Sequence, residues 1–162
     1  MNTNYDKIKS DLLDFGKRHG ACIGQYQRLY KAESIEDVIS VVKDNFEWCI
    51  QYKDFTDVLM ANREQFAEHR IWINQNVEIQ EGVGFLLATE GTINVNSYGT
   101  STINVNSCDT STINVKSYGT STMIIHTLNI ECEVNDRSIA RYIYDNRIVI
   151  ADTSVTVEQY HK

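Results

Sequence analysis

The chain has 162 residues, a formal net charge of −7 and 42% apolar residues. This length allows one or two small domains, and the apolar content suits a modest core rather than a disordered chain. The negative charge argues against nonspecific binding to phosphate backbones, which requires a positive surface. Such a chain is expected to stay soluble, to bind a basic partner, or to imitate nucleic acid.

No signal peptide, lipidation motif or long apolar run is visible at the N-terminus, so we expect a cytoplasmic protein with no membrane role. The four cysteines are widely separated and form no CxxC pair, which favours free buried thiols over a disulfide and, last, a metal site. The histidines lack zinc spacing, and no phosphate-binding glycine loop is present. We therefore expect neither a metal nor another cofactor. The cysteines are Cys22, Cys49, Cys108 and Cys132.

Residues 1–70 are predicted to form a helical domain, because apolar residues recur there at helical spacing with charges between them. The clearest helix start is Ser34. Its hydroxyl can accept hydrogen bonds from unpaired backbone N–H groups of the first turn, and acidic residues follow it in the sequence. The helix after Ser34 is predicted to run through Ile50. The expected helices are 4–18, 21–32, 35–50 and about 56–61, with a further short turn at 62–69.

A ten-residue unit repeats from Gly91 to Ser121, as TINVNSYGTS, TINVNSCDTS and TINVKSYGTS, and a decaying fourth copy begins TMIIHT. Within each unit two sets of residues alternate. The set that contains Ile93 and Val95 is apolar or small, and the other set is polar. This alternation is typical of extended chain with one buried face. A short fixed period also means that each unit must stack on its neighbours to bury a core.

Two arrangements fit this pattern. In a β-solenoid with one coil per ten residues, residue i lies over residue i+10, so that Ile93 stacks on Ile103 and Val95 on Val105. In an antiparallel meander with three-residue loops, Val95 would instead lie opposite Ile103. We favour the solenoid, because rows of identical residues suit a parallel, in-register stack.

The fold class predicted is α+β: a helical N-terminal region followed by a small parallel β-solenoid, of about ten residues per coil, with a β cap. The second domain is 71–162, in which 71–90 form the connection and first coil and the repeats occupy 91–127. A hairpin is predicted at 140–150, followed by strand residues near 155 and 157. This C-terminal part serves either as a cap or as an oligomerisation strand, because an uncovered strand edge recruits other chains.

The segment VNSYGTSTINV resembles the V-x-A-Y-G-N-A-T units of β-solenoid repeat proteins carried by phages, prophages and mobile elements, including those of gut Bacteroidetes. The resemblance covers about residues 91–127. Ser97 and Ser101 stand where those units have Ala, and Asp109 replaces a Gly. The resemblance implies a bacterial cell or a phage-infected host as the setting, and most members of that family have no known activity.

Candidate surface residues belong to the polar set of the repeats, which is expected to face outward. Tyr98 and Tyr118, with Cys108 between them, would form a row whose tyrosines lie two coils apart, roughly 9.6 Å, and could anchor a protein partner. Thr-x-Thr triplets would form two rows on a flat face like that of insect-type antifreeze proteins, although solvated β-favouring threonine is the preferred interpretation. The triplets contain Thr100, Thr102, Thr110, Thr112, Thr120 and Thr122.

No catalytic residue is nominated. His126 and Cys132 are a base and a potential nucleophile, but their separation of six residues matches no recognised arrangement, and an orienting group and an oxyanion hole are also needed. We therefore predict a non-enzymatic interaction or assembly module of phage or mobile-element type, with a protein partner and homo-oligomerisation. The alternatives are a phage-encoded inhibitor of a nucleic-acid-targeting bacterial defence complex, and an ice-binding protein.

Overall fold

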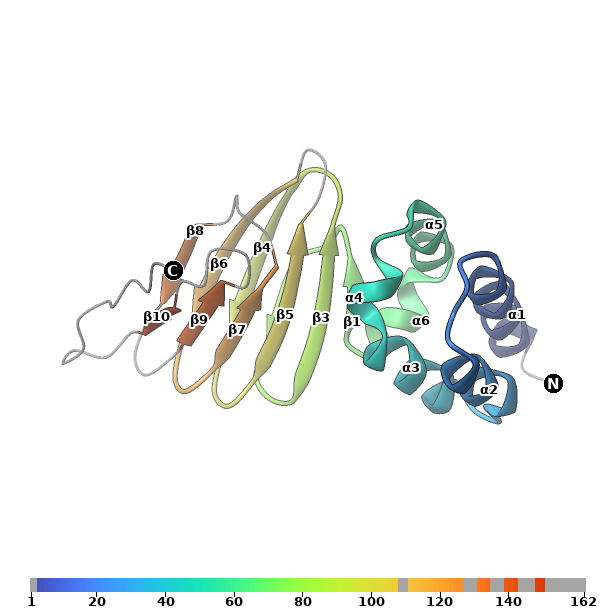
Figure 1. The fold of residues 1–162 in the computed structure, drawn as a ribbon. Helices are drawn as coiled ribbons and strands as arrows, with labels where there is room; N and C mark the ends of the chain where they lie inside the picture. Colours follow the sequence, from blue (N-terminus) through green and yellow to red (C-terminus); the bar gives the residue numbers. More distant parts are fainter. Residues whose placement is uncertain (1–2, 108–110, 127–130, 135–138, 143–147, 151–162) are drawn as a thin grey trace, which may run out of the picture. The chain divides into compact units, whose positions relative to one another are not determined.

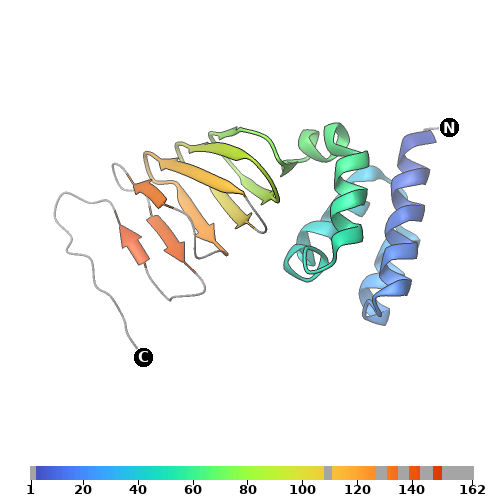
Figure 2. The same cartoon turned by 90° about the horizontal axis from the view of Figure 1, so that it is seen from above.

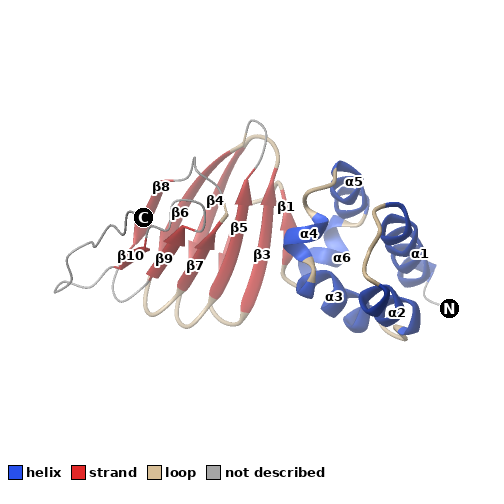
Figure 3. Cartoon of the chain, viewed as in Figure 1, coloured by secondary structure: helices blue, strands red, loops and turns tan. Residues whose placement is uncertain are grey.

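The computed structural model describes residues 3–107, 111–126, 131–134, 139–142 and 148–150. Within these residues the chain contains six helices and ten strands. It divides into a helical unit, Met1–His69, and a β unit, Arg70–Lys162 (Figures 1 and 3). The protein is therefore α+β, with its helices in the first unit and its mostly parallel strands in the second.

The helical unit is held together by phenylalanines drawn from four of its helices. Phe15, Phe46, Phe55 and Phe66 are all almost fully buried. The Phe55 ring lies 5.5 Å from that of Phe15 and 6.2 Å from that of Phe46, between ring centroids, within the range of favourable aromatic pairs. The helices are α1 (Thr3–Arg18), α2 (Ile23–Lys31), α3 (Ile35–Asp44), α4 (Phe46–Cys49), α5 (Lys53–Ala61) and α6 (Arg63–Glu68).

The predicted helix start at Ser34 is confirmed as a capping box. Ser34 Oγ accepts from the backbone N–H of Asp37 at 3.1 Å, and Asp37 Oδ2 accepts from the backbone N–H groups of Glu33 and Ser34. The Glu33 N–H, and then Ser34, hold the pKa of the Asp37 carboxyl below its usual range. Two orphan donors of the helix are thereby satisfied reciprocally.

The prediction that this helix continues to Ile50 is wrong. It ends at Asp44, and the short α4 begins at Phe46. At the break, the Asn45 side-chain amide donates to the carbonyl of Val41 at 2.7 Å. Asparagine side chains compete in this way for helical backbone groups, which explains why it interrupts an otherwise regular apolar pattern.

The β unit contains two sheets (Figures 1 and 2). The six-stranded sheet has the order β1-β3-β5-β7-β9-β10, and the four-stranded sheet has the order β2-β4-β6-β8. Odd- and even-numbered strands thus alternate between the sheets up to β9. The strands are β1 (Ile71–Ile73), β2 (Val77–Ile79), β3 (Val83–Ala88), β4 (Thr92–Ser97), β5 (Thr102–Ser107), β6 (Thr112–Ser117), β7 (Thr122–Ile125), β8 (Glu131–Val134), β9 (Ile139–Tyr142) and β10 (Ile148–Ile150).

Consecutive repeats lie in opposite sheets, so the predicted ten-residue coil is wrong. Ile93 pairs with Ile113 in the four-stranded sheet, and Ile103 pairs with Met123 in the six-stranded sheet, each twenty positions on. The antiparallel meander is also wrong, because these strand pairs are parallel. Chain length explains the error: six extended residues span about 20 Å, whereas four more span at most about 14 Å and cannot return to the start.

The predicted alternation is confirmed in β4 and β6 and from Thr102 to Val105 in β5, after which Asn106 is buried and Ser107 is half-buried. Ile93, Val95 and Ser97 are buried, while Thr92 and Asn94 are exposed. The buried side chains of both sheets meet in one hydrophobic cluster that extends from Val77 in β2 to Ala140 in β9. Rows of isoleucine, valine and methionine therefore form the core of the β unit.

Buried serines close the corners of the repeats. The hydroxyls of Ser97 and Ser101 lie 2.8 Å apart, and Ser101 also donates to the carbonyl of Tyr98 at 2.7 Å. The same arrangement recurs with Ser117 and Ser121, whose hydroxyls lie 2.7 Å apart. Because these hydroxyls satisfy one another and the turn backbone, serine fits inward positions of the repeats.

Glycine is required where one turn stacks on the next. Gly99 and Gly119 both have positive φ, 57° and 70°, in the turns that follow β4 and β6. A Cβ added to Gly119 would lie 3.1 Å from the backbone nitrogen of Gly99. The Gly119 turn can therefore approach the Gly99 turn because Gly119 lacks a side chain, and a Cβ on Gly99 would in turn lie 2.6 Å from the carbonyl oxygen of Gln80.

The C-terminal strands complete both sheets. β8 pairs with β6 in parallel, β9 pairs with β7 in parallel, and β10 reverses direction to pair with β9. This antiparallel pair confirms the hairpin predicted at 140–150. Its turn and the predicted strand near residues 155 and 157 lie outside the described residues.

Candidate functional site

The candidate site lies where α1 ends and α2 begins. Gly20, with a φ of 69°, follows the end of α1, and the Ala21 N–H donates to the carbonyl of Gly16 at 2.8 Å. Cys22 occupies the N-cap of α2 but contributes no side-chain cap bond. This reversal sets the last turns of α1 beside α2 and leaves two glycines, Gly16 and Gly20, in the wall between them.

An inner pocket of about 330 Å³ opens at this reversal. Its wall is mostly aliphatic and aromatic, and the polar Gln25 and Asn45 are already engaged through bonds to Arg28 and Val41. A concave apolar pocket of this size is of the kind that proteins use for binding. The lining residues are Leu12, Phe15, Gly16, Gly20, Ala21, Cys22, Gln25, Tyr26, Leu29, Val41, Val42, Asn45, Trp48 and Cys49.

A more open groove of about 500 Å³ adjoins the inner pocket and shares four lining residues with it. We call it the α1–α2 groove. Its α2 wall is made by residues at positions i, i+3, i+4 and i+7 of one helix, which share a face. The α1–α2 groove is lined by Gly16, Lys17, Gly20, Ala21, Ile23, Tyr26, Gln27 and Tyr30.

Two large apolar side chains of this stripe are left in solvent. Ile23 is 77% exposed and Tyr30 is 67% exposed, whereas Leu29 on the same helix is buried. Burying a side chain of this size is worth roughly 1.5–3 kcal/mol. The groove therefore offers apolar area that the helical unit itself does not cover.

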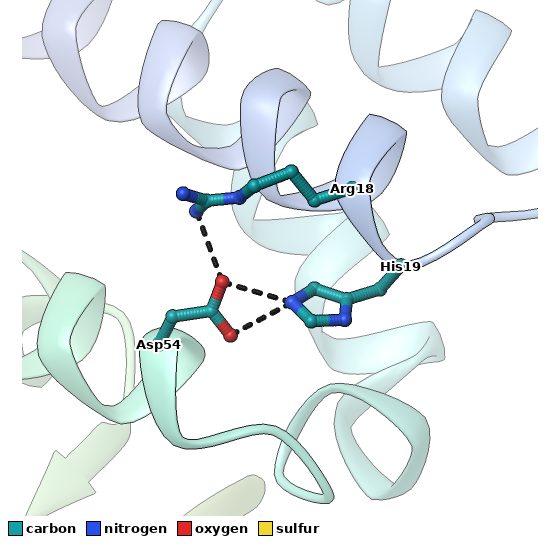
Figure 4. Close-up of polar contacts among 3 residues, drawn as sticks. All are labelled: Arg18, His19 and Asp54. Atoms are coloured by element: carbon teal, nitrogen blue, oxygen red, sulfur yellow. Dashed lines mark hydrogen bonds and ion pairs between the residues drawn. The ribbon is translucent and has the colours of Figure 1, made fainter.

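A polar cluster ties the end of α1 to the start of α5 (Figure 4). His19 Nε2 donates to the Asp54 carboxylate at 2.8 Å, and Arg18 lies 3.0 Å from the same group. Burial opposes ionisation of Asp54, but the His19 hydrogen bond and the charges of His19 and Arg18 leave its pKa below the usual range.

The surroundings of His19 favour a structural role for this cluster. Its ring packs against Tyr52, with centroids 4.0 Å apart and the rings tilted by 30°, and lies beside Phe15. No hydroxyl or thiol in the described part of the chain hydrogen-bonds to His19, which a nucleophile–base pair would require. The arrangement can hold the two helices together and position the Arg18 guanidinium.

Two of the four cysteines can be compared with the sequence prediction. Cys49 is a free buried thiol, as predicted, and its burial raises its pKa to about 12, so it stays protonated and unreactive. Cys22 is free but exposed, so its predicted burial is wrong. Cys108 lies outside the described residues, and only the backbone of Cys132 is described.

The predicted tyrosine row exists with a different spacing. Tyr98 and Tyr118 are neighbours in the stack, with ring centroids 5.1 Å apart and an angle of 9° between the rings. The estimate of roughly 9.6 Å is wrong because the two residues are one step apart in the twenty-residue register, not two. Since the rings stack face to face and both are half-buried, each covers a face of the other.

The three predicted threonine triplets do not share one face. Thr102 and Thr122 pair in the six-stranded sheet, while Thr112 pairs with Thr92 in the four-stranded sheet. Thr100 and Thr120 lie in the intervening turns, and Thr110 lies outside the described residues. The second triplet is separated from the first and third, which remain neighbours, because the ten-residue unit is half of the repeating period.

Outward asparagines form a further row on the four-stranded sheet. The Asn114 amide donates to Asn94 Oδ1 at 3.2 Å, and Asn76 Oδ1 accepts from the backbone N–H of Asn94 at 2.8 Å. These bonds between neighbouring strands stabilise the stack, in the manner of the asparagine ladders of other parallel stacks.

Helical periodicity alone does not reveal the α1–α2 groove, because it places Ile23, Tyr26, Leu29 and Tyr30 on one side of a helix. Each residue turns a helix by about 100°, so Leu29 lies about 100° around the helix from Tyr30, and the Ile23–Tyr30 stripe is separate from the buried side. This second apolar stripe on a nine-residue helix was the signal that could have revealed the groove.

The arrangement of His126 relative to Cys132 stays untested. His126 is half-buried, and the side chain of Cys132 is not described. Residues 3–107 and the further described segments contain no group of three or more His, Cys, Asp or Glu side chains placed to hold a metal. No helix among them has the length and apolarity needed to span a bilayer.

Comparison of the chain with protein-family models, curated proteins and solved structures found no match.

Proposed function

We propose that the protein is an interaction module that docks a protein partner in the α1–α2 groove. The observation that carries this proposal is the pair of exposed side chains, Ile23 and Tyr30, on one stripe of α2 beside an apolar pocket. Apolar side chains grouped around a concavity mark interaction sites, and tyrosine is enriched at interfaces. The function is therefore binding rather than catalysis.

The β unit acts in this proposal as a scaffold, a two-layer β-solenoid with twenty residues per coil. Pairing at twenty-residue spacing in both sheets and a core shared between them support it. In such stacks each layer contacts only its neighbours, so length and rigidity can change without altering a binding site elsewhere. The phage or mobile-element setting rests on the resemblance of the repeat alone.

Site-specific photocrosslinking tests the proposal. A benzophenone amino acid is placed at position 23 or at position 30, and the protein is irradiated in the cells that naturally produce it. The control carries the same group at position 60, because Met60 on α5 is 41% exposed and lines neither pocket. We expect the same partner protein at positions 23 and 30, and its loss from position 23 when Tyr30→Asp is added. Identical adducts from position 60, or none at either groove position, would overturn the proposal.

A further inference from the structure

The charges around the groove indicate what kind of partner it accepts, provided that the proposed docking function holds. Acidic side chains outnumber basic ones in the helical unit, yet none lines the α1–α2 groove or the inner pocket. Lys17 lines the groove, and α2 ends in the basic residues Arg28 and Lys31 without an acidic residue in its first turn. The lining of the groove thus carries a cation and no carboxylate, on a protein whose net charge is negative.

Two of these cations are available to a partner. Arg28 is already held, since its guanidinium lies 2.8 Å from both Asp44 and Gln25. Lys17 and Lys31 are exposed, and neither has an ion-pair partner among the residues that the structure describes. A partner carboxylate beside a docked apolar side chain could form an ion pair with Lys17 or Lys31 without displacing an existing ion pair.

The shape of the groove selects a helix as the docked element. Its α2 wall presents a stripe with helical periodicity, into whose ridges a second helix can pack. A docked strand would need a row of free backbone donors and acceptors, which the face of a helix does not offer. The nine residues of α2 extend over about 14 Å, which matches two to three turns of a partner helix. The inner pocket is large enough to take one bulky side chain from it.

A second copy of this chain fits the same surface less well. Symmetric pairing of α2 with α2 would bring Lys17 and Lys31 of both copies into one interface, and α2 carries no carboxylate to neutralise them. Like charges placed together across an interface are unfavourable. A partner with acidic residues avoids this cost.

We propose that the α1–α2 groove binds an amphipathic helix that presents two or three large apolar side chains and flanks them with carboxylates. The largest of these side chains enters the inner pocket, against Phe15 and Trp48. The carboxylates lie beside Lys17 and Lys31. Apolar burial supplies the affinity, and the charges supply preference for acidic partners.

Two synthetic peptides test this chemistry. Each has roughly sixteen residues with leucines at positions i, i+3, i+4 and i+7, and the remaining positions carry glutamate and glutamine in one peptide and lysine and glutamine in the other. Neither contains tryptophan. Binding to the full-length Trp72→Phe protein is followed by the fluorescence of Trp48, which lines the inner pocket. We expect the glutamate peptide to bind at least about tenfold more tightly, with the difference shrinking at high salt.

Variants separate the contributions of charge and apolar contact. Lys17→Glu combined with Lys31→Glu should reverse the preference between the peptides. Ile23→Asp combined with Tyr30→Asp should abolish binding of both, while Met60→Asp, which alters an exposed apolar residue outside the groove, should leave both affinities unchanged. Circular dichroism of each variant checks that the helices remain folded.

The failures are distinguishable. Equal binding of both peptides, lost in the Ile23→Asp/Tyr30→Asp protein, would overturn the acidic preference and leave the docking function intact. No binding of either peptide, with partner crosslinks still obtained at positions 23 and 30, would overturn the helical partner alone. A dimer in sedimentation that Ile23→Asp dissociates would assign the groove to a second copy and also overturn this inference. No peptide binding and no crosslinks would overturn both proposals.

Discussion

In the helical unit each large core side chain occupies a position of its own, whereas the β unit places the same few side chains in successive layers. Phe55 contacts Phe15 and Phe46 in an irregular cluster, and Phe66 is buried in the same unit. Ile93 and Ile113, by contrast, are equivalent residues in consecutive layers of one sheet. The regular unit repeats a surface along its length, and the irregular unit can form a single cavity with a specific shape. A specific binding cavity is therefore expected in the helices.

The largest expected effect comes from removing one irregular core residue. Phe55→Ala should cost about 3–5 kcal/mol of the helical unit's free energy of unfolding, because the Phe55 side chain is fully buried among other rings. Urea titration followed by circular dichroism should show early loss of the helical signal. If the strand signal disappears at the same urea concentration, the two units unfold together and the comparison between them fails.

Gly119→Ala tests the stacking of turns in the β unit. The positive φ of Gly119 and the approach of Gly99 make an added Cβ unfavourable, and we expect a loss of about 1–3 kcal/mol. The matched control is Gly24→Ala in α2, where a Cβ meets nothing within 4 Å. That change should be neutral or stabilising by up to about 1 kcal/mol, because alanine favours helix. Equal effects of the two substitutions on thermal unfolding would contradict the close approach of the turns.

The serine corners predict non-additive substitutions. Ser101→Ala removes the partner of a buried hydroxyl on Ser97 and should cost about 1–3 kcal/mol. Removing both hydroxyls leaves no unsatisfied group, so Ser97→Ala combined with Ser101→Ala should cost less than the sum of the single changes. Additive costs in a double-mutant cycle of unfolding free energies would show that the two hydroxyls do not depend on each other.

The smallest expected effect concerns Asp54. Its pKa is lowered in the folded protein, so its stabilising contribution is present above the unfolded pKa, about 3.9, and is lost as the pH falls through the folded value. Because the pair with Arg18 and His19 is partly exposed, it is worth up to about 1 kcal/mol. Asp54→Asn should therefore lower the melting temperature of the helical unit slightly at neutral pH and flatten its decline in acid. An unchanged acid profile would mean that the pair contributes nothing.

The sequence predicts much of the local structure and less of how it is assembled. Helix starts such as Ser34 and the alternation around Ile93 depend on neighbouring residues, so they could be predicted. The register depends on chain length as well: six extended residues cannot be closed into a coil by the remaining four. The groove was hidden for another reason, since periodicity predicts which residues of α2 share a face but not which face a neighbour covers.

The most direct test of where this protein binds is an NMR titration of the full chain with the glutamate peptide, observing every assigned backbone amide. We expect shifts concentrated between Gly16 and Lys31 and around Trp48, with amides of the β unit unchanged. Shifts centred on Tyr98 and Tyr118 would contradict the proposed docking site and return the binding surface to the repeats.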